Sequence, residues 1–281
     1  MIGCKRSMSY ISRSAAMLVI SLAASVASAQ NVPGSAASQA TQRDLAGIYH
    51  TRSPWQLVVT EGPMEKDYGD NDAPGKLTFC LYRRPGSPCI SAPVTPPLRD
   101  PATNDAPAWV PHYLQSVRPV YPQGSGGRPL LMIVTGSLNA GNGDQVVATQ
   151  LLKYDAAHDA FQRVFAQRVG RNNNQDIRFV ERGPLMGSVI TVEPQQKRPY
   201  GYWIVMLRPS AAGDYQPVLR YGSSTLYNDG NPLPVIDSEM PNILARLGMW
   251  KAGQPLPMPQ PIDGKVVCPK PVLKRRELWC Q

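Results

Sequence analysis

The second half of the chain repeats one local pattern, in which short apolar stretches rich in β-branched and aromatic residues alternate with brief polar turns. Seven such stretches follow one another from residue 130 onward, at 130–135, 145–154, 160–168, 176–182, 187–193, 200–208 and 215–221. Consecutive strands with short connections and no helix between them pair as antiparallel neighbours, because a parallel pair needs a long crossover. The sequence therefore predicts an all-β fold built as an antiparallel meander, either a sandwich or a partial propeller-like sheet.

Two of these stretches differ in the exposure that their side chains predict. Alternation along 160–168 would place Phe161, Arg163 and Phe165 on one face, so this strand is expected to be half exposed. Along 200–208 both alternating sets are apolar. That pattern predicts a central strand that is covered on both sides.

One short helix is expected near the C-terminus. Asp237 or Ser238 can cap its start, and Gly248 supplies a left-handed stop. Between them four apolar residues follow the i, i+3, i+4, i+7 spacing of a helix face: Met240, Ile243, Leu244 and Leu247. We expect this helix to pack one face on the sheet.

Three further segments lack a regular pattern. Residues 30–43 are polar, have no apolar period and are interpreted as a flexible leader. Residues 85–129 carry eleven prolines, a density that stops helices and central strands, so an irregular segment with short strands of its own around 109–120, or a boundary between two subdomains, is expected. A Pro-rich C-terminal arm is predicted over 253–281. A single β-rich domain over 44–281 is preferred.

The first 29 residues have the order of a secretory signal peptide. Three basic residues precede an apolar run at 15–29, which ends in the triplet Ala27-Ser28-Ala29. The run is shorter than the roughly 20 apolar residues that span a bilayer. Cleavage after Ala29 would leave 252 residues (281 minus 29) without a transmembrane anchor. The mature protein is therefore expected to be periplasmic or secreted.

The four cysteines that follow the leader fall into two local pairs. Cys80 and Cys89 flank a turn-like segment at 84–88, whereas Cys268 and Cys280 bracket a separate C-terminal segment. An even number of cysteines in an oxidising compartment predicts disulfides. Of the three connectivities that four cysteines allow, the two local bonds are the most economical. No closely spaced Cys or His pair suggests a metal site, and no cofactor is expected.

The mature chain is basic, with a formal charge of about +6 (9 minus the 3 basic residues of the leader). This charge favours an anionic partner, either an envelope polymer or another protein. The basic runs, such as 274–276, are too short for a nucleic-acid arm and are interpreted as solvated faces. The candidate binding residues are five arginines on the strands at 160–182: Arg163, Arg168, Arg171, Arg178 and Arg182.

Motif searches do not point to a common enzyme class. The chain has no G-x-S-x-G, no H-E-x-x-H and no phosphate-binding glycine loop. His50, His112 and His158 fall on separate elements, and a structural role is expected for each, although His50 at the expected end of a strand is the first choice for mutation. The leading hypothesis is an exported, non-catalytic binding protein. The alternative is an envelope-directed hydrolase that uses carboxylates within 61–72.

Two oxygen-rich turns invite comparison with calcium loops. Asp70-Asn71-Asp72 resembles the opening of such a loop, but Pro74 and Leu81 stand where ligands are needed, so the match fails. The turn at 139–144 holds a single carboxylate. The hairpin turn at 154–161, with its Asp-x-x-x-Asp-x-aromatic pattern, resembles turns of bacterial β-propeller and related repeat proteins. No repeat of constant length accompanies it, so membership of that family is not inferred.

Overall fold

Antiparallel strands dominate the structure, as the sequence predicts. The computed structural model describes residues 40–95, 109–123, 127–139, 145–171, 174–228, 233–257, 268 and 270–281. The predicted signal peptide at 1–29 lies outside these residues. None of the helices within the described ranges has the length and apolar character needed to span a bilayer.

The N-terminal sheet holds three strands in the order β1-β2-β5, and its connections carry a short helix and a two-stranded ribbon. Its elements are β1 (Ala40–Asp44), α1 (Ala46–Tyr49), β2 (Gln56–Glu61), β3 (Glu65–Lys66), β4 (Asp72–Ala73) and β5 (Leu77–Tyr82). The disulfide between Cys80 and Cys89 closes the loop that follows β5, which confirms the predicted local pairing. It ties that loop to the edge of the sheet, where Leu81 and Ile90 form a β-bridge.

Two four-stranded meanders follow in chain order. The middle sheet consists of β6 (Tyr113–Val120), β7 (Leu130–Gly136), β8 (Gln145–Asp155) and β9 (Ala160–Arg171). The C-terminal sheet consists of β10 (Asp176–Phe179), β11 (Val189–Pro194), β12 (Tyr202–Pro209) and β13 (Tyr215–Gly222). The second helix, α2 (Val235–Arg246), and the hairpin of β14 (Pro271–Lys274) and β15 (Glu277–Cys280) complete the fold.

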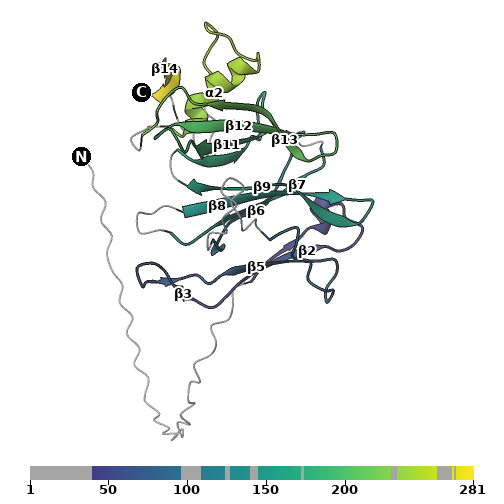
Figure 1. Ribbon diagram of the computed structural model, residues 1–281. Helices are drawn as coiled ribbons and strands as arrows, with labels where there is room; N and C mark the ends of the chain where they lie inside the picture. Colours follow the sequence, from purple (N-terminus) through teal and green to yellow (C-terminus); the bar gives the residue numbers. More distant parts are fainter. Residues whose placement is uncertain are drawn as a thin grey trace, which may run out of the picture. The chain divides into compact units, whose positions relative to one another are not determined.

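The middle sheet is packed on both faces, which explains why its strands are apolar at consecutive positions. On β7, Leu131 and Ile133 join the core shared with the N-terminal sheet, whereas Leu130 and Met132 join the core shared with the C-terminal sheet. Alternate side chains of a strand point to opposite faces, so one strand serves two cores. Figure 1 shows the resulting stack, in which the strands β6 to β9 lie between β2 and β5 on one side and β11 to β13 on the other.

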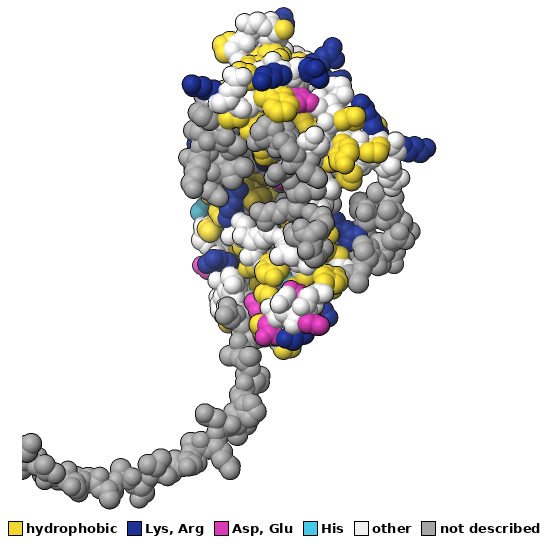
Figure 2. Space-filling view, turned by 90° about the vertical axis from the view of Figure 1, so that its left-hand side faces the viewer, with side chains coloured by type: hydrophobic (Ala, Val, Ile, Leu, Met, Phe, Trp, Pro, Cys, Tyr) yellow, Lys and Arg dark blue, Asp and Glu magenta, His cyan; other side chains and the backbone are white. Residues whose placement is uncertain are grey.

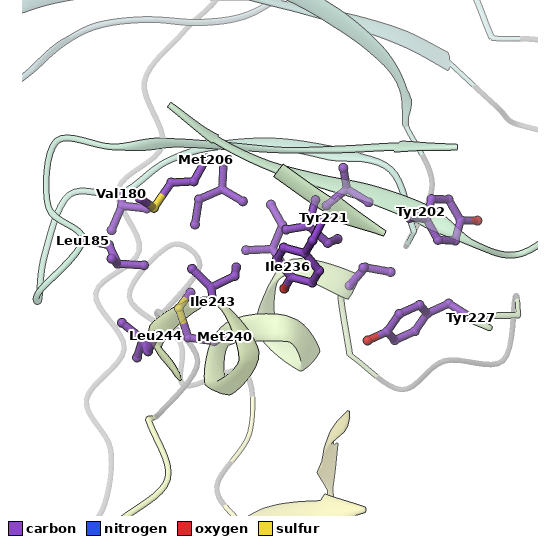
Figure 3. Packing of buried hydrophobic residues seen from close by; sticks show 14 residues of the cluster. Val180, Leu185, Tyr202, Met206, Tyr221, Tyr227, Ile236, Met240, Ile243 and Leu244 are labelled. Carbon is purple, nitrogen blue, oxygen red and sulfur yellow. The ribbon is translucent and has the colours of Figure 1, made fainter. Parts of the chain in front are cut away.

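The free face of the C-terminal sheet is covered by α2. Figure 3 shows Met206 of β12 and Tyr221 of β13 packed against Ile236, Met240 and Ile243 of the helix. The predicted central position of β12 is confirmed, because β11 and β13 flank it and Ile204 and Met206 are fully buried. The α2 layer therefore buries the apolar stripe that the sequence shows at this helix.

Two boundaries differ from the sequence expectation at the N-terminus. Residues 40–43 of the predicted flexible leader belong to β1, which pairs along its whole length with β2. An edge strand can be held by main-chain hydrogen bonds alone. Such a strand needs no apolar period, so the sequence pattern did not predict it. His50 does not end a strand; it follows helix α1 with a left-handed φ of 49°.

The predicted face of β9 is also corrected. The register shifts between Leu151 and Leu152, which pair with Phe165 and Arg163 and leave Val164 as an extra residue. A bulge of one residue reverses the side-chain alternation beyond it. Phe161 consequently packs in the core shared with the N-terminal sheet, and Phe165 packs in the core shared with the C-terminal sheet.

Helix α2 begins earlier than predicted and ends as predicted. Pro234 precedes its first turn, and Asp237 and Ser238 are buried inside the helix instead of capping it. At the other end Gly248 has a φ of 70°, with hydrogen bonds from its N–H to Ala245 and from the Met249 N–H to the Leu244 carbonyl. This is the two-bond Schellman arrangement in which a glycine takes the left-handed position.

Candidate anion-binding hairpin

The five arginines predicted to bind a partner do not form one surface. Arg163 and Arg168 lie on the face of β9 toward the N-terminal sheet, where Arg163 donates to the Thr95 carbonyl at 2.8 Å and Arg168 stands 5.9 Å from the Trp109 ring. Arg178 lies on β10, in another sheet. Arg182 is exposed after β10, and the side chain of Arg171 lies outside the described residues.

The Arg178 guanidinium pairs with carboxylates of the protein itself and is not part of an exposed surface. Its guanidinium donates to both carboxylate oxygens of Asp237, at 2.5 and 3.1 Å, and lies 3.5 Å from Asp176. Only 13% of its side chain is exposed, and Asp237 is fully buried. Burial alone would lower the pKa of Arg178, but the two carboxylates raise it. The pair therefore joins the C-terminal sheet to α2.

The carboxylates proposed for a hydrolase lie on the exposed β3–β4 ribbon and the strand before it. Asp72 pairs with Lys66 at 2.6 Å, and Glu65 pairs with Lys76 at 3.5 Å. Asp67 accepts hydrogen bonds from the main chain of its own turn, including the Gly69 N–H at 2.7 Å. These contacts account for Glu65, Asp67 and Asp72 as turn chemistry and surface ion pairs.

A second cluster centres on Asp159 in the turn between β8 and β9. Its carboxylate accepts hydrogen bonds from Ser53 Oγ at 2.5 Å, Trp55 Nε1 at 2.9 Å and Tyr154 Oη at 2.7 Å. Arg83 lies 3.7 Å away and also donates to the Asp159 carbonyl. The donors come from the loops beside β2 and β5 of the N-terminal sheet and from β8 of the middle sheet, so one carboxylate ties two layers together.

The electrostatics of Asp159 fit a structural role. Partial burial would raise the pKa of this carboxyl, but the hydrogen bonds from Ser53, Trp55 and Tyr154, together with the Arg83 guanidinium, lower it to about 2. A group with so low a pKa stays ionised at neutral pH and is poorly suited to transfer protons, because a general acid or base works best with a pKa near the working pH.

The histidines stay on separate elements in the structure. His112 is buried, and its Nδ1 lies 2.9 Å from the Pro74 carbonyl. His158 lies 2.6 Å from Asp155 within the β8–β9 turn. His50 is exposed after α1. The contacts of His112 and His158 join neighbouring segments of the chain.

The C-terminal hairpin gathers basic side chains that the fold leaves free. Residues 268–281 contain four basic residues and one acidic residue. Lys270, Lys274, Arg275 and Arg276 are all exposed, and within the described part of the chain none of them forms a salt bridge. Lys274 ends β14, and Arg275 and Arg276 form the turn that leads to β15. We call these three residues, Lys274, Arg275 and Arg276, the basic tip.

The backbone of the basic tip is unusual for its sequence. Lys274 pairs with Glu277, so Arg275 and Arg276 alone make the turn, and both have positive φ, 48° and 71°. A two-residue hairpin turn with two positive φ values favours Asn-Gly. Most other residue types pay about 1 kcal/mol of conformational free energy for each left-handed position. The tip therefore keeps two arginines where the backbone favours other residues.

Several contacts fix this strained turn in place. Cys268 and Cys280 form the second disulfide, with 5.4 Å between their Cα atoms, as the sequence predicted. From α2, Asn242 donates to the Arg276 carbonyl at 3.0 Å, and Ser238 donates to the Leu278 carbonyl at 3.1 Å. Leu278 is buried beside Leu233 and Cys268. The helix and the disulfide thus hold the backbone of the hairpin while the basic side chains face outward.

From the sequence, residues 274–276 were expected to be a solvated face and were not among the candidate binding residues. The bracketing cysteines were a usable signal, because a local disulfide implies that the segment between them is a closed loop. The turn itself could not be predicted from the sequence, because Arg-Arg lacks the Asn-Gly signature of a two-residue hairpin. Comparison of the chain with family models, with curated proteins and with solved structures finds no match.

Proposed function

We propose that this chain is an exported, non-catalytic binding protein that attaches to an anionic component of the cell envelope through the basic tip of its C-terminal hairpin. The proposal keeps the binding function and the anionic partner expected from the sequence. It moves the binding residues from the β9 and β10 arginines to Lys274, Arg275 and Arg276.

One observation supports the proposal: three neighbouring exposed cations are held on one hairpin backbone and form no salt bridge within the described residues, and Arg275 interacts with Glu277 only at longer electrostatic range. A preorganised site loses less conformational entropy on binding, so its contacts contribute more to affinity. Backbone strain at an exposed position persists where the surrounding structure enforces it, and such positions cluster at functional sites. The contacts from Asn242 and the disulfide supply that enforcement here.

The test compares two variants that lose the same charge at different places. In K274Q/R275Q/R276Q the basic tip is neutral, whereas R43Q/R84Q/R128Q removes three exposed cations that lie elsewhere, on β1, after β5 and before β7. We expect the wild type to bind an anionic matrix and isolated envelope fractions in a salt-dependent manner. The tip variant should elute at clearly lower salt than the control variant.

A third variant tests the surface that the sequence had suggested. R163Q/R168Q/R182Q removes three of the strand arginines and leaves Arg178, which stabilises the fold, untouched. If this variant loses binding while the tip variant elutes with the wild type, the partner binds the strand arginines and the hairpin site is refuted. Retention that does not change with salt for any variant would refute an electrostatic partner altogether.

A further inference from the structure

The cations of the hairpin lie beside apolar side chains that the fold does not cover. Leu273 precedes the basic tip on β14 and is 41% exposed. Trp279 on β15 is partly exposed, and the Lys274 Nζ lies 6.0 Å from its ring. An amphipathic aromatic residue next to lysine and arginine is typical of segments that lie at the boundary between lipid headgroups and acyl chains.

A second element at the same end of the stack shows the same combination. The segment after α2 exposes Met249, 44% of whose side chain is accessible, two residues before the exposed Lys251. Figure 1 shows this segment and the hairpin at the end of the stack where α2 covers the C-terminal sheet. Apolar and basic side chains therefore project from two separate loops at one end.

At the opposite end of the stack, the segment that includes the β3–β4 ribbon is acidic. Residues 61–76 contain five acidic and two basic residues, and they include the β3–β4 ribbon. Figure 2 shows Lys and Arg side chains gathered with apolar ones at the upper end, whereas most Asp and Glu side chains in that view lie at the lower end. A charge distribution of this kind orients a protein that approaches an anionic plane, because the basic end is attracted and the acidic segment is repelled.

We propose that the anionic partner is a lipid bilayer with anionic headgroups. The basic tip and Lys251 would contact the phosphates, and Leu273 and Met249 would enter the interface between headgroups and acyl chains. This inference rests on the proposed function and narrows it to one kind of surface. A soluble anionic polymer would engage the same cations, but it would give no advantage to the exposed Leu273 and Met249.

The experiment measures flotation of the protein with vesicles of phosphatidylcholine alone and of phosphatidylcholine mixed with phosphatidylglycerol. Inorganic polyphosphate serves as a soluble polyanion without an apolar phase. L273S/M249S removes the apolar contacts at the basic end. I48S/M64S is its control, because Ile48 on α1 and Met64 between β2 and β3 are at least as exposed as Leu273 and Met249, respectively. Thermal unfolding of each variant checks that the fold is retained.

The wild type should float only with the phosphatidylglycerol vesicles. Each cation near such a surface strengthens binding about fivefold, so K274Q/R275Q/R276Q should bind about 100-fold more weakly. L273S/M249S should lose roughly tenfold on vesicles and nothing on polyphosphate, since the half-covered Leu and Met side chains each bury only part of their surface. The I48S/M64S control should bind as the wild type does.

The outcomes separate the two proposals. If L273S/M249S floats as well as the wild type while the charge variant still loses binding to vesicles and to polyphosphate, the lipid inference is overturned and the anionic binding function stands. Equal binding of the wild type and the charge variant to both probes, or binding to neither, overturns the proposed function as well.

Discussion

Among the hairpin turns that hold non-glycine residues in the left-handed region, two use their side chains in opposite ways. Between β8 and β9, Asp159 has a φ of 46°, and its carboxylate accepts hydrogen bonds from three side chains, two from the loop before β2 and one from β8. Between β14 and β15, Arg275 and Arg276 also have positive φ values, but they are held through the backbone, where the Asn242 side-chain amide donates to the Arg276 carbonyl. The first turn uses its charge to hold the fold, and the second exposes its charged side chains.

The two turns differ in what explains the strained backbone. A left-handed Asp159 is explained by contacts in the structure, so it needs no partner outside the protein. The arginine pair is held through its backbone, and its side chains form no hydrogen bond or salt bridge of this kind within the described residues. This difference motivates the proposed binding function. The comparison also predicts that mutations in the two turns separate stability from binding.

The largest effect is expected from Asp159→Ala. The change removes the acceptor of three side-chain hydrogen bonds and leaves the Trp55 N–H inside the protein without a partner, so we expect a loss of about 3 kcal/mol in the free energy of unfolding. Denaturant unfolding measures it, with Lys274→Ala as the control that should stay within about 0.5 kcal/mol. A loss below about 1 kcal/mol would show that Asp159 does not clamp the two sheets.

Removal of the second disulfide should release the other turn. In C268S/C280S the entropic restraint on a 12-residue separation is lost, which corresponds to about 2 to 3 kcal/mol in the loop-closure account. We expect faster amide hydrogen exchange in β14 and β15 and weaker retention on anionic surfaces. The control C80S/C89S should leave that retention unchanged. Unaltered exchange in the hairpin would mean that α2 alone holds it.

Acid should weaken the first turn selectively. Because the pKa of Asp159 is lowered to about 2 in the folded protein, its contribution to stability is fully present above the ordinary Asp pKa near 4 and is lost as pH falls toward 2. The contribution is on the order of 2 kcal/mol. The gap in unfolding free energy between wild type and D159N should therefore be constant above about pH 5 and shrink below pH 4. A gap that is independent of pH would contradict this assignment.

The smallest effect on stability, and of opposite sign, is expected at the basic tip. R275N/R276G installs the residues that a two-residue hairpin turn prefers and should stabilise the fold by up to about 1 kcal/mol. The same variant should bind anionic surfaces more weakly. A stabilised variant with unchanged binding would show that the arginines are an accidental choice of turn residues and would remove the basis for the binding proposal.

The local pattern of the sequence was enough to predict the antiparallel strands, the central position of β12, both disulfides and the end of α2 at Gly248. Each of these features depends on residues that are close along the chain, such as an alternating strand, a nearby cysteine or a glycine after an apolar stripe. Their free energies are decided within a few residues, so they can be recognised without knowledge of distant partners.

Only the tertiary structure decided which charges are free. The bulge at Val164 separates Phe161 from Phe165, and α2 turns Asp237 from an expected cap into the buried partner of Arg178. The basic tip became visible as a site only after β14 and β15 were paired and α2 was docked against them. The pairing of Asp237 with Arg178 and the bond from Asn242 to Arg276 join residues tens of positions apart. Whether a charge is compensated depends on its surroundings in space, which the order of residues does not contain.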